Sequence, residues 1–202
     1  MSKIRPIESR VLELARRCGI LRPRDAVAQG IHPSALKRMC QKGLLKSVGW
    51  GLYVLPTDDP SAHHGLALVS KRTPKAVGCL LTALQFHGIG TQAPFEVWIA
   101  LGRRTARPRM DYPPLRVMRF SGPALAEGVE EHEVEGVPVR VFCPAKTVAD
   151  CFKCRNKIGL DVALEALREV LRQRKCTSDD LWRYAKVCRV AAVMRPYMEA
   201  MP

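Results

Sequence analysis

Five polar side chains near the N-terminus have the types and spacing to bind a polyanion. On a helical wheel for residues 34–42 they share one arc, and apolar residues fill the other arc. Arg, Lys, Gln and Ser can donate hydrogen bonds to base edges and phosphate oxygens. The stretch therefore predicts a helix with one packing face and one face that contacts DNA. The residues of this polar arc are Ser34, Lys37, Arg38, Gln41 and Lys42.

Four nearby side chains complete the predicted DNA-binding set, namely Arg22, Arg24, Lys46 and Trp50. Trp50 stands between two glycines, at the expected tip of a turn. It either contacts the DNA backbone there or caps the hairpin. The alternative for the whole set is a small helical domain with a solvated, charged face.

Three helices and a hairpin would position these side chains. The apolar spacing predicts helices that end at glycines, over residues 9–17, 23–29 and 33–42. Two apolar runs around Gly49-Trp50-Gly51 then predict a hairpin that ends at Pro56. This is the element order of a winged helix-turn-helix, in which the second helix of the motif enters the major groove. We therefore expect a winged helix-turn-helix DNA-binding domain over residues 1–56.

The charge distribution agrees with that expectation. The chain of 202 residues has a net charge of +14, and residues 1–56 account for +8 of it, with eleven basic and three acidic side chains. A basic patch attracts nucleic acid, although it can also serve solubility alone. Apolar residues make up 47% of the chain, but no run is long enough to cross a membrane. The N-terminus has no apolar leader, so we expect a cytoplasmic protein without a membrane partner.

A proline-bounded segment, residues 56–61, has no periodicity and predicts the boundary of a second domain over residues 57–202. Helical patterns come first, at 62–71 and 79–87. A mixed sheet is expected within residues 76–143, from strands at 95–101, 115–120, 129–135 and 137–142. Helices are predicted at 144–154, 160–174, 178–188 and 190–200. The predicted fold class is α+β, with an N-terminal winged helix-turn-helix followed by a mixed α/β domain that ends in a helical segment.

The cysteines and paired histidines could bind a metal, but their spacing argues against it. Cys151 and Cys154 form a lone Cys-x-x-Cys pair, whereas a structural zinc site needs four ligands. His63-His64 is likewise isolated. All eight cysteines are expected to be reduced and mostly buried thiols. We predict neither a metal nor a cofactor.

Four arginines lie between two predicted strands, at Arg103, Arg104, Arg107 and Arg109. Arginine pairs well with phosphate and carboxylate groups, so these residues are a candidate contact for phosphate or for a partner. The alternative is a mobile, solvated hairpin tip.

Patterns of catalytic residues are missing from the sequence. The acidic stretch at 130–135 has no lysine partner of the kind that nucleases use. The sequence also has no nucleophile elbow, no phosphate-binding glycine loop and no His-Glu-x-x-His motif. We therefore predict no catalytic residues and a protein that is not an enzyme.

Five segments along the chain carry a family resemblance, namely residues 51–56 (GLYVLP), 79–88 (CLLTALQFHG), 144–152 (PAKTVADCF), 155–159 (RNKIG) and 194–197 (MRPY). Together they resemble the AbiEi family of bacterial antitoxins from type IV, abortive-infection toxin–antitoxin systems. The resemblance extends over essentially the whole chain, and the segment after Cys143 is its most specific part.

The resemblance implies two activities. The N-terminal domain would bind repeats in its own promoter, with a dimer on the DNA as one arrangement, and repress the operon. The C-terminal domain would counter a partner toxin that is a nucleotidyltransferase, a role in phage defence. Lys146 and Asp150 are spaced to pair on one helix face, in a structural role or at the toxin. The alternatives are a DNA-targeted nucleic-acid-processing enzyme and a plain transcription factor with a ligand-sensing second domain.

Overall fold

A computed structural model describes residues 6–57 and 59–201, which fold as two compact units. The first unit takes in the chain up to Pro74, with two later segments, Arg109–Pro113 and Glu133–Val139. The second unit takes in Lys75–Pro108, Pro114–His132 and Arg140–Pro202. The first unit thus continues past the proline-bounded segment that we predict as a domain boundary. A functional division at that segment stays a prediction.

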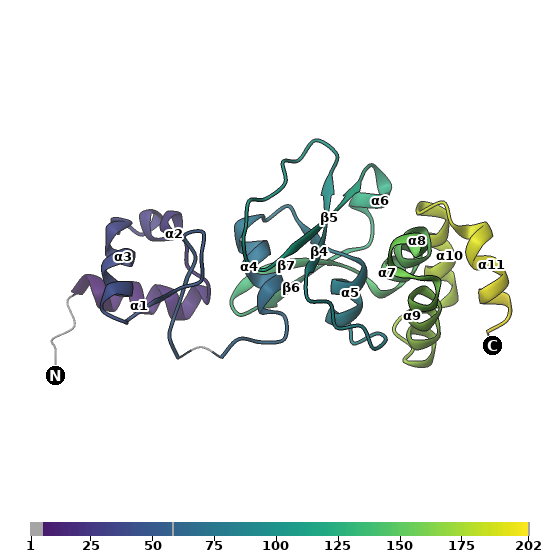
Figure 1. The fold of residues 1–202 in the computed structure, drawn as a ribbon, viewed down its shortest axis with the longest axis horizontal. Helices are drawn as coiled ribbons and strands as arrows, with labels where there is room; N and C mark the ends of the chain where they lie inside the picture. Colours follow the sequence, from purple (N-terminus) through teal and green to yellow (C-terminus); the bar gives the residue numbers. More distant parts are fainter. Residues whose placement is uncertain (1–5, 58, 202) are drawn as a thin grey trace. The chain divides into compact units, whose positions relative to one another are not determined.

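The first unit begins with three helices and a short hairpin (Figure 1). A fourth helix follows and completes its regular structure before Pro74. The strands of the hairpin are antiparallel, with Lys46 opposite Val54. In order, the elements are α1 (Pro6–Cys18), α2 (Pro23–Ala28), α3 (Ser34–Gln41), β1 (Lys46–Ser47), β2 (Tyr53–Val54) and α4 (His64–Arg72).

One apolar cluster holds α1, α2, α3 and the hairpin together. Val11 and Ala15 from α1, Leu36 from α3 and Leu21 before α2 are fully buried in it. Leu21 also forms a β-bridge with Tyr53, which fixes the hairpin next to the start of α2. Most of the stability of such short helices comes from burying an apolar face rather than from helix propensity.

The chain also forms a five-stranded sheet, with strand order β5-β4-β3-β7-β6. β3 is antiparallel to β4 and parallel to β7, and β4 is parallel to β5. The sheet is therefore mixed, as the sequence predicts. The strands are β3 (Val77–Gly78), β4 (Val97–Gly102), β5 (Leu115–Phe120), β6 (Val129–Val134) and β7 (Val137–Phe142).

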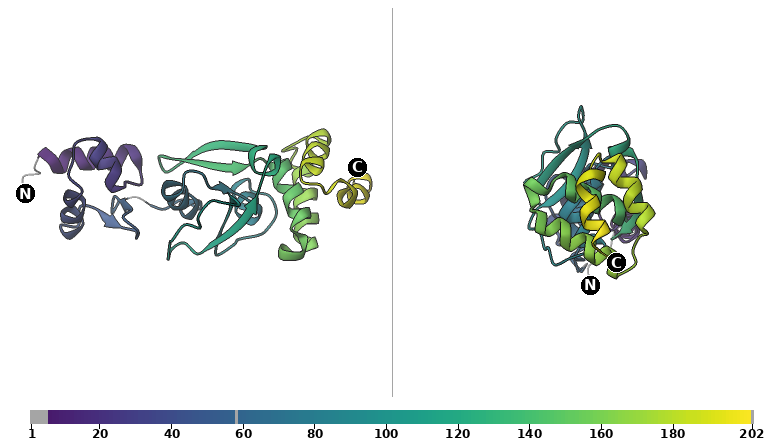
Figure 2. Two further views of the ribbon diagram at one scale, coloured as in Figure 1. Left: turned by 90° about the horizontal axis from the view of Figure 1, so that it is seen from above. Right: turned by 90° about the vertical axis from the view of Figure 1, so that its right-hand side faces the viewer.

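Helices of the second unit gather around α7, which packs against α5, α9, α10 and α11 (Figures 1 and 2). Eight of the ten residues of α7 are buried. A capping box opens α10, since the Thr177 hydroxyl accepts a hydrogen bond from the Asp180 backbone amide. The helices are α5 (Leu80–Phe86), α6 (Pro123–Ala126), α7 (Pro144–Lys153), α8 (Arg155–Ile158), α9 (Leu160–Arg172), α10 (Ser178–Val187) and α11 (Ala191–Glu199).

The protein is a mixed α+β protein, and every helix and strand predicted from the sequence is present within a few residues. Three short elements were not predicted, namely β3, α6 and α8. β3 has two residues and both α6 and α8 have four, so none is long enough to establish a periodic pattern.

Candidate nucleic-acid interface

The exposed face of α3 and its C-terminal cap carries all five residues of the predicted polar arc. On the opposite face, Ala35, Leu36 and Met39 are at most 4% exposed and belong to the apolar cluster. The predicted division of this helix into a buried and an exposed face is confirmed. A role in DNA binding stays a prediction for the exposed residues, which are Ser34, Lys37, Arg38, Gln41 and Lys42.

Three of these side chains have no hydrogen-bond or ion-pair partner within the described structure. Lys37, Arg38 and Gln41 form no side-chain hydrogen bond or ion pair with any residue of 6–57 or 59–201. Ser34, at the start of α3, lies with its Oγ 2.8 Å from Nδ1 of His32. The long cationic and amide donors in the middle of the arc are therefore available to an external partner.

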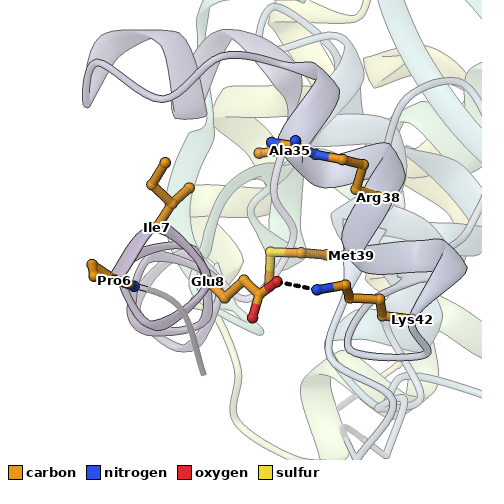
Figure 3. A pocket seen from close by; sticks show the side chains of 7 residues that line it. All are labelled: Pro6, Ile7, Glu8, Ala35, Arg38, Met39 and Lys42. Carbon is orange, nitrogen blue, oxygen red and sulfur yellow. Dashed lines mark hydrogen bonds and ion pairs between the residues drawn. The ribbon is translucent and has the colours of Figure 1, made fainter. Parts of the chain in front are cut away.

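Lys42 differs from these residues because an ion pair holds it. Its Nζ lies 2.5 Å from Oε1 of Glu8 on α1, as the dashed line in Figure 3 shows. The pair lines a cavity of about 550 Å3, together with the apolar side chains of Ile7, Ala35 and Met39. Lys42 could contact DNA only by leaving Glu8 or by sharing its charge with a phosphate.

Arg22 is placed differently from the polar arc. Its side chain is 16% exposed and ion-pairs with Asp25, three residues later in α2. A guanidinium nitrogen, Nη1, also donates to the backbone carbonyl of Lys71 near the end of α4. Arg22 thus connects the start of α2 with α4, while Arg24, two residues on, is exposed.

Asp25 is the acidic centre of this connection. Its carboxylate lies 3.3 Å from Nη2 of Arg22 and 3.1 Å from Nζ of Lys71. Burial acts to raise the pKa of Asp25, but the hydrogen bonds from Arg22 and Lys71 outweigh it and lower the pKa below its ordinary value. The carboxylate therefore stays charged and keeps both cations in place.

Trp50 lies in the turn between β1 and β2 and is 38% exposed, and Lys46 on β1 is also exposed. The backbone of Trp50 has a left-handed φ of 52°, which the turn requires and which costs energy in a residue other than glycine. Arg72, the last residue of α4, holds its guanidinium carbon 5.7 Å from the centre of the indole ring. The turn thus presents an aromatic ring and a guanidinium side by side.

A second connection within the first unit joins α4 to the segment 133–139. Nδ1 of His64 lies 2.6 Å from Oε2 of Glu135, whose other oxygen accepts from the Ser61 backbone amide at 2.8 Å. Burial opposes ionisation of Glu135, but the hydrogen bonds from His64 and Ser61 lower its pKa. The sequence offers no signal for this pairing, because 71 residues separate the two side chains.

The four loop arginines are all exposed. Arg107 donates from Nη2 to the Leu115 carbonyl at 3.1 Å, which fixes it against β5. The other three form no hydrogen bond or ion pair with the residues that the structure describes, so a role toward phosphate or a partner stays a prediction. They are Arg103, Arg104 and Arg109.

Lys146 and Asp150 form the predicted pair on α7, in the interior. Both side chains are 0% exposed, and Nζ of Lys146 lies 2.5 Å from Oδ2 of Asp150. The ammonium is also 4.0 Å from the centre of the Phe142 ring, and Cys188 donates its thiol to Asp150 at 3.2 Å. Burial raises the pKa of Asp150 against the pull of Lys146. No atom of this pair can touch a partner protein while the unit is folded.

All eight cysteines are free thiols, and burial raises the pKa of Cys151 well above its ordinary value. Cys154 is partly buried. Within the described ranges, no three His, Cys, Asp or Glu side chains come together as a metal-binding group. None of the helices in the described part of the chain has the length and hydrophobicity that a membrane crossing requires.

The first unit therefore combines three packed helices, a short hairpin and an exposed basic helix face. Comparison with protein families gives a match within this unit. Residues 9–56 match the family model described as transcriptional regulator, AbiEi antitoxin, which confirms the resemblance over that segment. The match ends before α4, so α4 to α11 are not part of it.

Comparison with solved structures supports the fold. The chain is similar to the RV2827C protein from Mycobacterium tuberculosis, with a TM-score of 0.62 and 16% sequence identity. The similarity covers 92% of this chain and 73% of that one, so it includes both units. The comparison with curated proteins found no match.

Proposed function

We propose that this protein is an AbiEi-type antitoxin that also represses its own operon. In this proposal the first unit is a winged helix-turn-helix that binds repeats in double-stranded promoter DNA, with α3 in the major groove. A dimer would occupy two half-sites. The protein acts by binding and carries out no catalysis.

The exposed face of α3 is the observation that carries the DNA-binding half of the proposal. Its donors, Lys37, Arg38 and Gln41, have no partner among the described residues, and they project from a helix whose other face is fixed in the apolar cluster. A rigid helix with a cationic face fits the major groove, where such side chains reach base edges and phosphates. The match of residues 9–56 to transcriptional regulators supports the same role.

The antitoxin half of the proposal places the contact with the toxin pathway in the second unit. The toxin would be a nucleotidyltransferase encoded beside this chain. Because Lys146 and Asp150 are buried, they would support this activity only by holding α7 in place. Exposed groups such as Arg103 and Arg104 are the candidates for direct contact.

One strain can test both halves of the proposal. A reporter is fused to the DNA upstream of this reading frame, and the neighbouring nucleotidyltransferase gene is placed under separate induction. The full chain should lower reporter output and restore growth during induction of the toxin. A chain with Lys37→Ala, Arg38→Ala and Gln41→Ala should restore growth but lose repression.

The matched control carries Asn156→Ala, Lys157→Ala and Arg168→Ala, which remove the same charge from exposed positions on α8 and α9. It should repress the reporter like the unaltered chain. Equal repression by all three chains would refute the role of α3. Failure of the unaltered chain to restore growth would refute the antitoxin role.

A further inference from the structure

Helix α4 lies outside the segment that matches the regulator family, yet its C-terminal end is fixed to the DNA-binding element. Asp25 on α2 holds Nζ of Lys71 at 3.1 Å and Arg22 at 3.3 Å, and Arg22 donates to the Lys71 carbonyl. The three side chains are between 10% and 20% exposed. Partly buried, charge-assisted contacts of this kind are stronger and better ordered than surface ion pairs. The end of α4 therefore has a fixed position beside the start of α2.

The hairpin turn also lies next to the start of α2. Leu21 pairs with Tyr53 of β2, and a Cβ added to Gly51 would lie 3.7 Å from the ring of Pro23, the first residue of α2. The turn between β1 and β2, the start of α2 and the end of α4 are thus neighbours. Trp50 and Arg72 project from two of these three elements and meet at the surface, with the guanidinium 5.7 Å from the indole centre.

Arg72 is exposed and has no acidic partner among the described residues, because Asp25 is already occupied by Arg22 and Lys71. A cation–π contact with an aromatic ring restricts a guanidinium and leaves N–H groups free to donate. A phosphate oxygen is the ligand that best suits such a group, because it accepts two N–H bonds and carries a full charge.

We propose that Arg72 is a phosphate contact of the DNA-binding surface, supplied by α4 and oriented by Trp50. The DNA-binding unit then extends to Pro74, beyond the winged element itself. Trp50 is a positioning residue here, since it acts through the guanidinium. This inference rests on the proposed DNA binding, and its test separates the two.

The test is a fluorescence-anisotropy titration of the full chain between 0.05 and 0.3 M salt. Two labelled duplexes of about 30 base pairs are used, one from upstream of this reading frame and one with the same bases scrambled. Because a phosphate contact carries no sequence information, Arg72→Ala should weaken both complexes equally. We expect a roughly eightfold loss at 0.1 M salt and a fall of about 0.9 in the salt slope.

Arg168→Ala, on α9 of the second unit, removes the same charge from another exposed position and should change neither quantity. Arg72→Lys keeps the charge, so it should restore most of the slope but less of the affinity. Trp50→Ala should reduce affinity without changing the slope, whereas Trp50→Phe should be close to the unaltered chain. Circular dichroism and thermal unfolding check that each variant is folded.

If the unaltered chain binds DNA and Arg72→Ala has the same affinity and salt slope as Arg168→Ala, the inference is wrong and the proposed function still stands. Loss of binding to the upstream duplex alone would also overturn it, because that pattern indicates a base contact. An unaltered chain that binds neither duplex would refute both proposals.

Discussion

Two helices of this protein use cationic side chains in opposite ways. On α3, Lys37 and Arg38 are exposed and unpaired within the described structure. On α7, Lys146 is fully buried and is held by a carboxylate and an aromatic ring. A solvent-exposed lysine can exchange water for a phosphate at little cost, whereas separating a buried ion pair leaves an uncompensated charge in the interior, which is strongly unfavourable. We infer that α3 serves recognition and that α7 serves stability.

Breaking the buried pair should have the largest effect. Lys146→Met leaves the Asp150 carboxylate uncompensated in the interior, which typically costs about 3–5 kcal/mol. We expect a loss of that size in the free energy of unfolding, measured by urea denaturation. The double variant Lys146→Met with Asp150→Leu removes both charges and should recover much of the loss. A single variant as stable as the unaltered chain would contradict the structural role of this pair.

Crowding the space around Lys146 should cause the second-largest loss of stability. Gly128 has a φ of +73°, and a Cβ there would lie 2.8 Å from Cβ of Lys146 and 3.0 Å from Cε1 of Tyr184. Gly128→Ala should destabilise the protein by about 1–3 kcal/mol, through backbone strain and overpacking. Gly122 has a similar φ of +55° but open space around it, so Gly122→Ala is the matched control for strain without a clash. If Gly128→Ala and Gly122→Ala lose the same stability in thermal unfolding, the close approach at Gly128 is unimportant.

Two hydrogen-bonded carboxylates of the first unit, Asp25 and Glu135, should make its stability depend on pH. The pKa values of Asp25 and Glu135 are lowered in the folded protein, from ordinary values of 3.8 and 4.5. Their contribution is therefore present above those values and is lost as the pH falls through the lower, folded pKa values. Unfolding monitored between pH 6 and pH 2.5 should show declining stability below about pH 4.5. Asp25→Asn should flatten part of this decline, and an unchanged profile would contradict the ionised Asp25 network.

The ion pair beside α3 should matter least for stability. The Glu8 side chain is 14% exposed, but Lys42 is half exposed and in contact with water, so the pair should contribute about 1 kcal/mol or less. Glu8→Gln should change the midpoint of thermal unfolding only slightly. It should also free Lys42 for phosphate and steepen the salt dependence of DNA binding. A large loss of stability would show that this pair resembles the buried one instead.

Local patterns in the sequence predicted the parts of the fold that repeat within a few residues. The wheel for residues 34–42 separated the buried from the exposed side chains of α3, and the four-residue spacing of Lys146 and Asp150 predicted their pairing. Each pattern depends on one helix, where neighbours in space are three or four residues apart.

Contacts between distant segments could not be predicted in this way. Lys42 meets Glu8 across 34 residues, Arg22 meets Lys71 across 49, and His64 meets Glu135 across 71. The sequence therefore assigned Arg22 and Lys42 to the same set as Lys37, although the structure gives them partners within the first unit. Sequence patterns also do not identify Arg72, because its cation–π contact with Trp50 depends on where α4 ends relative to the hairpin.

The exposed face of α3 is best tested by a direct titration of the full chain against the upstream duplex. The variant Lys37→Ala, Arg38→Ala, Gln41→Ala is compared with the charge-matched variant Asn156→Ala, Lys157→Ala, Arg168→Ala across a range of salt concentrations. Each lost base-edge contact should cost about 1–3 kcal/mol, and each lost phosphate contact should lower the salt slope by about one. The account predicts these losses for the α3 variant alone, with its unfolding transition unchanged. Equal affinity and equal slope for the two folded variants would contradict it.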